Sequence, residues 1–265
     1  MNYVLITGGA SGMGRATALK LAENGYYVFS CDIKKNEQEV EGIEQIVVDV
    51  TDMQSVKEAF EVVSQKTNSL FAVINFAGII MMNSLIEISE EDFVKIFNVN
   101  VFGAYRINKT FFPLVKNGGG RIIVTTSELA PNKILPFNAI YSISKKALDA
   151  YAQGLTMELS LLGVPVITLR PGAVETPILK DSNKEMELLN NNTELYKNTI
   201  TNFKKIVDKE QGGAISPTKI AELVLRILKK RNPKHIYSKN VSKKLKLLNL
   251  LPTKMQAKIF KMMLK

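Results

Sequence analysis

The feature that most constrains the fold of this chain is a short apolar run that breaks into glycines and then continues as a helix. Residues 3–7 (Tyr-Val-Leu-Ile-Thr) are β-branched or apolar, which is typical of a buried strand. Gly8, Gly12 and Gly14 follow and allow a tight turn with close approach of a ligand to the backbone. Residues 15–22 have a helical composition, and a helix N-terminus offers free N–H groups to a pyrophosphate. This order of strand, glycine loop and helix predicts a dinucleotide site.

Strand-like and helix-like segments alternate along the rest of the chain. Such alternation predicts βαβ units with right-handed crossovers, and hence a single doubly wound α/β domain with a parallel sheet. Ligands of such sheets bind at the carboxyl ends of the strands. The further predicted strands are residues 26–31, 45–49, 70–75, 121–126, 164–170 and 235–237, and the predicted helices are residues 52–67, 89–116, 139–163 and 217–230.

Composition excludes several classes of site. The 265 residues, 46% of them hydrophobic, suffice for one large domain. Cys31 and His235 are the only residues of their types, so we expect no disulfide framework, no metal site and no histidine-based triad. A single cysteine fits a reducing, cytoplasmic environment. We also expect neither a signal peptide before the first strand nor an apolar run of about 20 residues that could span a membrane.

The net charge of +10 is concentrated at the C-terminal end. Residues 226–265 contain 13 Lys or Arg and no Asp or Glu, whereas residues 1–225 contain 22 basic and 25 acidic side chains. The domain itself is therefore not expected to bind nucleic acid. We expect a domain over residues 1–240, followed by a helical, basic and amphipathic tail over residues 241–265.

The tail carries a lysine stripe beside an apolar stripe. Such a pattern is typical of a helix that lies on an anionic membrane surface, so we predict peripheral membrane contact. The alternative is a helix packed on its own domain or on a neighbouring subunit. The lysines are Lys254, Lys258, Lys261 and Lys265, and the apolar residues are Met255, Ile259 and Met262.

Tyr141 and Lys145 stand four residues apart in a predicted helix, so they share one face of it. An ammonium group beside a phenol stabilises the phenolate, so we expect the pKa of Tyr141 to fall from about 10 toward neutrality. A tyrosine tuned in this way can exchange a proton with an alcohol oxygen.

Two further positions have competitors nearby. The hydroxyl of Ser127, at the end of a predicted strand, can hydrogen-bond a substrate oxygen, but Thr125 and Thr126 offer the same group. A buried Asn100 can bend its helix and hold a water, but Asn98 lies two residues earlier. The spacing of the residues does not choose between them.

Asp32 ends the second predicted strand, where an acidic side chain can bind the adenosine ribose. Its charge repels a 2′-phosphate and favours NAD over NADP, although Lys34 and Lys35 stand close by. Asp32 can alternatively be a simple turn former. Asp49, after the third strand, can accept a hydrogen bond from adenine or start the next turn.

These motifs together resemble the short-chain dehydrogenase/reductase family, with matches from residue 3 to about 240. The resemblance implies a Rossmann fold, an NAD(P)-dependent oxidoreductase acting on CH–OH groups, and a homodimer or homotetramer. It places the family's catalytic residues on Asn100, Ser127, Tyr141 and Lys145. Tyr141 is then the general acid/base, assisted by Lys145, while Ser127 binds the oxyanion and Asn100 holds a water. The chain departs from the family at Phe76, where a second Asn is usual.

The predicted cofactor site collects residues from the glycine loop and from the ends of several strands. Small residues there let the backbone run beside a flat cofactor, and a threonine after the sixth strand can bond the nicotinamide carboxamide. The predicted cofactor-binding residues are Gly8, Ser11, Gly12, Met13, Gly14, Asp32, Asp49, Val50, Asn75, Ala77, Gly78, Tyr141, Lys145, Pro171, Gly172, Val174 and Thr176.

Apolar segments are expected to flank the substrate. They are residues 79–82, 129–130, 134–137 and 177–179, and residues 178–213 are expected to form a lid. We therefore predict a hydrophobic alcohol or carbonyl substrate of steroid, retinoid or fatty type, unless about half of these residues belong to the core. The alternative function is a non-catalytic NAD(H)-binding redox sensor or scaffold at a membrane surface.

Overall fold

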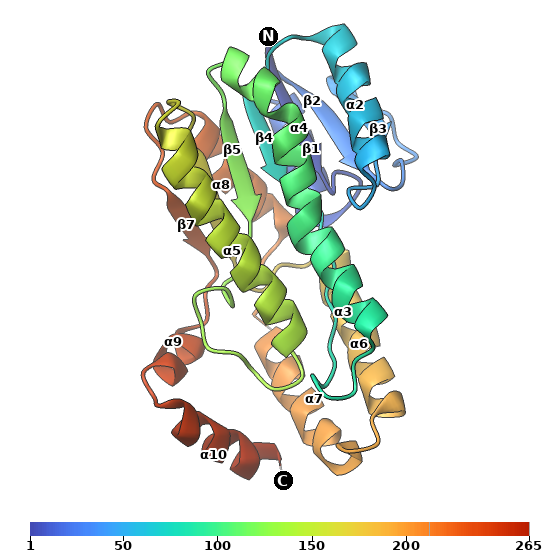
Figure 1. Ribbon diagram of the computed structural model, residues 1–265, viewed down its shortest axis with the longest axis vertical. Helices are drawn as coiled ribbons and strands as arrows, with labels where there is room; N and C mark the ends of the chain where they lie inside the picture. Colours follow the sequence, from blue (N-terminus) through green and yellow to red (C-terminus); the bar gives the residue numbers. More distant parts are fainter. Residues whose placement is uncertain (212, 265) are drawn as a thin grey trace.

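A computed structural model describes residues 1–211 and 213–264, without the side chains of residues 206, 208–211 and 246. Within that part, seven strands form one parallel sheet in the order β3-β2-β1-β4-β5-β6-β7 (Figure 1). This confirms the predicted doubly wound α/β domain. The strands are β1 (Asn2–Thr7), β2 (Tyr26–Asp32), β3 (Ile43–Val47), β4 (Ala72–Asn75), β5 (Arg121–Thr125), β6 (Val166–Pro171) and β7 (Ile236–Lys239).

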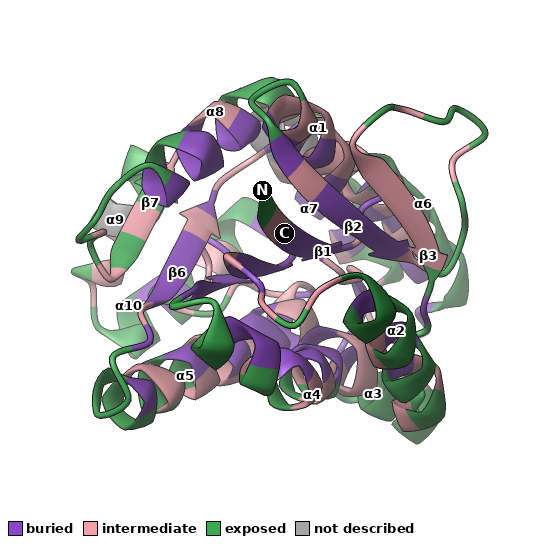
Figure 2. Cartoon of the chain, turned by 90° about the horizontal axis from the view of Figure 1, so that it is seen from above, coloured by how far each residue is buried: buried purple, intermediate pink, exposed green. Residues whose placement is uncertain are grey.

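Helices cover both faces of the sheet, as Figure 2 shows from above. Alternate side chains of a strand point to opposite faces, so Leu5 enters one apolar cluster and Val4 enters the other. Because helices cover both faces, the side chains along the strands are mostly apolar and buried. Polar side chains that could bind a ligand are therefore expected at the strand ends. One face carries α2 (Met53–Lys66), α4 (Ala104–Asn117) and α5 (Ala139–Ser160), and the other carries α1 (Gly12–Ala22) and α8 (Pro217–Leu228).

The predicted helix over residues 89–116 is interrupted. It begins as α3 (Glu90–Phe97), capped as expected by Ser89, whose Oγ accepts a hydrogen bond from Asp92 N at 3.1 Å. A π-helical segment (Asn98–Gly103) follows before α4 begins. The prediction of one continuous helix was therefore wrong. A π-helical segment of six residues is too short to change the spacing of apolar residues in a recognisable way.

The third strand lies two residues earlier than predicted. Pairing with β2 begins at Val28–Ile43 and ends at Asp32–Val47, so β3 covers Ile43–Val47 rather than residues 45–49. β3 is an edge strand whose side chains are half-buried or exposed, and its apolar pattern is therefore weak.

The predicted lid consists of two helices, α6 (Pro177–Asn192) and α7 (Lys197–Gln211). The tail forms α9 (Lys243–Asn249) and α10 (Thr253–Leu264). These elements extend beyond the carboxyl end of the sheet in Figure 1. A separate apolar cluster joins α6, α7 and α10 to two loops, and its buried members are Met82, Phe137, Met186, Leu189, Ile200, Phe203 and Leu264.

The tail helix α10 is packed on one side and exposed on another. Leu264 is buried and Phe260 half-buried in the cluster with α7, so the predicted alternative of packing on its own domain describes this side. Met255 and Met262, from the predicted apolar stripe, remain 50% and 72% exposed. Lys265 lies outside the described residues. No described helix combines the length and apolar character needed to cross a membrane.

Candidate active site

The parallel sheet brings the predicted site residues to one edge. Thr7 pairs with Asn75, Asn75 with Val124, and Thr125 with Leu169, so β1, β4, β5 and β6 end side by side. The glycine loop, residues 75–78, Ser127 and residues 171–176 all follow these ends directly.

The glycine loop leaves no room for side chains. Gly8 has a φ of +70°, and a Cβ placed there would stand 2.8 Å from Ala77 N. Gly12 has a φ of +51°, and its Cβ would stand 3.0 Å from Thr176 Cγ2. The loop is therefore pressed between the chain that follows β4 and the chain that follows β6, and only glycine allows this approach.

The start of α1 fits a pyrophosphate. Ser11 precedes the helix, but its side chain caps no N–H group, so this residue leaves the first amides open to a ligand. The loop itself is anchored, because Ala10 N donates to Asp32 Oδ2 at 3.0 Å. A fixed loop with open amides at a helix N-terminus is what dinucleotide binding requires.

Sequence reasoning missed Arg15 at this end of the site. Its Nη2 donates to Gln38 O at 3.4 Å, and its buried Nη1 has no partner among the described residues. Asn36 Nδ2 in turn donates to Ala10 O at 3.2 Å, which holds this loop next to the glycines. A guanidinium at this loop could accommodate a 2′-phosphate. The basic residue directly after Gly14 was the available signal.

The geometry separates the two candidate asparagines. Asn100 is buried; its Oδ1 accepts from Ile79 N at 2.8 Å and its Nδ2 donates to Ile79 O and Ser144 Oγ, both at 3.0 Å. Asn98 instead accepts from Arg106 Nη2 at 2.8 Å. Asn100 therefore joins α5 to the loop that follows β4, inside the predicted site.

The three hydroxyl candidates also differ. The Ser127 hydroxyl acts on Tyr141 and lowers the pKa of its phenol, whereas Thr126 Oγ1 donates to Asp149 Oδ1 at 3.1 Å. The buried Thr125 Oγ1 has no partner among the described residues. Of the three side chains, only that of Ser127 affects the pKa of the phenol.

Burial acts in opposite directions on Tyr141 and Lys145. Desolvation lowers the pKa of Lys145 to about 8, and its Nζ donates to Thr125 O at 3.3 Å. Desolvation raises the pKa of Tyr141 to about 12; the Ser127 hydroxyl opposes this rise, and the Glu128 carboxylate adds to it. The expected fall in the pKa of Tyr141 is thus wrong for the protein alone. The ammonium stands 5.9 Å from the ring centroid, and its effect does not outweigh burial.

Two predicted cofactor residues, Asn75 and Asp49, use their side chains in structural hydrogen bonds. Asn75 Nδ2 donates to Asn108 Oδ1 at 2.8 Å and to Ile123 O at 3.2 Å. Asp49 Oδ1 accepts from the backbone N of Thr51 at 2.8 Å, so it forms the turn that was the alternative for this residue. The buried Asn75 Oδ1 has no partner among the described residues, so only the amide nitrogen of this side chain is committed to the fold.

A cavity of about 400 Å³ lies between α6 and the segment after β4. Its lining is mixed rather than uniformly apolar, since Met81 and Leu188 stand beside Glu185 and Asp92. Glu185 is held there by Met82 N, which donates to its Oε2 at 3.3 Å, and burial raises the pKa of Glu185. Met81 belongs to a small apolar cluster with Ile140, and both Ile88 and Tyr141 pack against that cluster.

Comparison with known proteins identifies the family. The profile described as short chain dehydrogenase matches residues 2–187. The chain is 28% identical to a 3-ketodihydrosphingosine reductase of Bacteroides thetaiotaomicron, over 87% of this chain and 84% of the relative. It is 32% identical to a 3-amino-tetrahydro-pyrrolizinone reductase of Xenorhabdus hominickii, over 93% and 91%. The chain belongs to the family of short chain dehydrogenases. It is an oxidoreductase of the kind that acts on hydroxyl and carbonyl groups.

A solved structure agrees with this assignment. The alcohol dehydrogenase of the archaeon Thermococcus sibiricus, complexed with 5-hydroxy-NADP, superposes with a TM-score of 0.70 at 27% identity, and the match covers 90% of this chain and 96% of that one.

We predict that Glu128→Gln lowers the pKa of Tyr141. The carboxylate opposes formation of the phenolate, so removing its charge shifts deprotonation to lower pH, while the amide oxygen can still accept a hydrogen bond from Ser242 N. A ¹³C-tyrosine NMR titration, with the signal assigned by Tyr141→Phe, measures the shift. The control is Glu158→Gln, which removes an exposed carboxylate from α5, the helix that carries Tyr141. Equal titration in the two variants would contradict the prediction.

Proposed function

We propose that this chain transfers hydride between a nicotinamide cofactor and a hydrophobic alcohol or carbonyl compound, with Tyr141 as general acid/base. The observation that carries the proposal is the convergence of three groups at the glycine-lined edge. The Ser127 hydroxyl lowers the pKa of Tyr141, and the buried ammonium of Lys145 lies 5.9 Å from the centroid of the phenol ring. A purely structural role does not readily explain why a hydroxyl, a phenol and an ammonium group lie together at this edge.

Each group has a role that follows from its surroundings. The cofactor supplies or accepts the hydride. Ser127 donates a hydrogen bond to the substrate oxygen, where negative charge develops. Because burial keeps Tyr141 protonated at neutral pH, the phenol suits proton donation to a carbonyl oxygen. Asn100 fixes the backbone of Ile79, and a Cβ on Gly78 would stand 3.1 Å from Asn100 Oδ1 and 3.4 Å from Lys145 Nζ. The absence of a side chain at Gly78 thus leaves Lys145 open to a ribose.

The substrate is proposed to be lipophilic, with α6 and α7 as its lid. Met82 and Phe137, predicted as pocket wall, are buried against these two helices, so they join the lid to the site. Ile134 is 41% exposed and remains available for contact. The relative named as a reductase of 3-ketodihydrosphingosine supports a keto substrate.

A panel of lipophilic ketones and secondary alcohols, assayed with NAD(H) and NADP(H), tests this function. We expect turnover by the wild type and a loss of about 10²–10⁴-fold in kcat for Tyr141→Phe, because the proton donor is removed. Tyr105→Phe, on exposed surface of α4, is the control and should keep full activity. Full turnover by Tyr141→Phe would refute the role of Tyr141. Cofactor binding without turnover of any panel member would favour the redox sensor.

We propose NAD as the preferred cofactor, because Ala10 N fixes the Asp32 carboxylate beside the glycine loop, where an acidic side chain can bind the adenosine ribose. Asp32→Ser should therefore lower the ratio of kcat/KM with NAD to that with NADP by at least about tenfold. Glu39→Gln, in the exposed loop after β2, should leave the ratio unchanged. If the wild type instead prefers NADP and Arg15→Ala loses that preference, Arg15 binds the 2′-phosphate of NADP and the proposal of NAD is wrong.

We also propose that the tail contacts an anionic membrane surface. Leu250 and Met262 are 79% and 72% exposed, and no acidic residue occurs after residue 225 to oppose the charge of the lysines. An apolar side bordered by lysines matches the interface of an anionic bilayer. The homodimer or homotetramer stays a prediction.

In liposome flotation, we expect the full chain to bind anionic vesicles and not zwitterionic ones. Lys254→Glu/Lys258→Glu/Lys261→Glu should abolish binding. Lys57→Glu/Lys109→Glu/Lys116→Glu changes the net charge equally at exposed sites on α2 and α4 and should still float. Equal loss in both triple variants would mean that only net charge matters.

A further inference from the structure

The loop over residues 128–138, between Ser127 and Tyr141, is bound by the C-terminal tail. Its first residue, Glu128, accepts a hydrogen bond from Ser242 N at 2.6 Å through Oε2. Further along, Lys133 N donates to Asn249 Oδ1 at 2.7 Å. Asn249 Nδ2 donates to Asn132 Oδ1, and Lys133 Nζ donates to Leu251 O. More than 100 residues of sequence separate the two sides of each contact.

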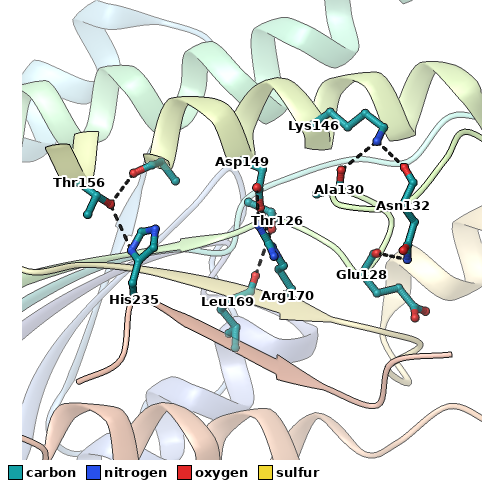
Figure 3. A network of polar contacts seen from close by, with 11 residues as sticks. Thr126, Glu128, Ala130, Asn132, Lys146, Asp149, Thr156, Leu169, Arg170 and His235 are labelled. Atoms are coloured by element: carbon teal, nitrogen blue, oxygen red, sulfur yellow. Dashed lines mark hydrogen bonds and ion pairs between the residues drawn. The ribbon is translucent and has the colours of Figure 1, made fainter. Parts of the chain in front are cut away.

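The same loop is held from the opposite side by the helix that carries Tyr141. Lys146, in α5, donates from Nζ to Ala130 O at 2.9 Å and to Asn132 O (Figure 3). Asn132 Nδ2 also donates to Glu128 O at 2.5 Å. Asn132 is buried, with 6% of its surface exposed, and it therefore links the tail, α5 and the residue next to Ser127.

The far end of the loop is constrained as well. Phe137 has a φ of +57°, which is unusual for a bulky side chain and persists only where the surroundings hold it. Its ring packs edge-on against Tyr196 and Phe203, with centroid distances of 5.0 and 5.1 Å. The lid therefore fixes the end next to Tyr141, while the tail fixes the end next to Ser127.

We propose that Asn249 is a positioning residue of the active site, which acts through Asn132 and the loop to fix Ser127 relative to Tyr141. This inference rests on the proposed function for its catalytic consequence. Asn249 itself touches none of the proposed catalytic residues. Its two hydrogen bonds reach both Asn132 and the adjacent backbone, so it holds the loop at the point where α5 also holds it. α9 thus forms part of the active-site framework as well as part of the tail.

Hydrogen exchange of the full chain tests the positioning without any substrate. In Asn249→Ala, we expect amides of residues 128–138 to exchange at least tenfold faster than in the wild type, while β1 and β4 stay protected. Thr253→Ala, an exposed tail residue outside these contacts, is the matched control and should leave the loop unchanged. Unchanged exchange in Asn249→Ala would overturn the inference.

Kinetics then test the catalytic consequence. Asn249→Ala should lower kcat about tenfold or more, with KM for the cofactor unchanged, because small displacements of reacting groups are costly. Asn132→Ala should act in the same way, and the double variant should be no worse than the single ones, since the residues form one contact. Additive losses, or losses confined to the cofactor KM, would overturn the positioning role. A wild type without turnover would refute the proposed function, and hydrogen exchange alone would then decide this inference.

Discussion

One of the tightest constraints in the molecule is the contact between the backbones of Gly8 and Gly14. A Cβ on Gly14 would stand 2.0 Å from Gly8 O, so α1 begins directly against the end of β1. This contact fixes the direction of α1, whose buried face packs beside α8 on the same face of the sheet. The uncapped N-terminus of α1 and the loop to Asp32 take their positions from it. The cofactor end of the site is thus a consequence of helix packing as much as of loop sequence.

The catalytic end depends on burial instead of close backbone contact. Tyr141 and Lys145 both lose solvent, which favours the neutral form of each, so the pKa of the phenol rises and that of the ammonium falls. A neutral phenol and a lysine with a pKa of about 8 give the free protein a proton donor at physiological pH. Charges brought by a ligand would act strongly here, since they too would be poorly screened.

Much of the fold could be predicted from the sequence because its signals are local. The alternation of strands and helices, the glycine loop and the cap at Ser89 each depend on neighbouring residues. The choice of Asn100 over Asn98 came from the family resemblance, and the geometry separates them only through contacts with Ile79 and Ser144. Features set by distant contacts were missed: Arg15 near Gln38, and the tail bound to residues 128–138. The pKa of Tyr141 was predicted in the wrong direction, because spacing along a helix contains no information on burial.

The π segment at Asn98–Gly103 has a consequence for the evolution of this chain. A π turn holds one residue more than an α turn, and each residue of an α-helix turns the chain by about 100°. Deleting any one residue here would restore a regular helix, but would rotate Asn100 away from Ile79 and Ser144 or shift α4 against α2. We therefore expect related sequences to contain no insertions or deletions in this segment. Substitutions of the exposed Phe102 should be tolerated.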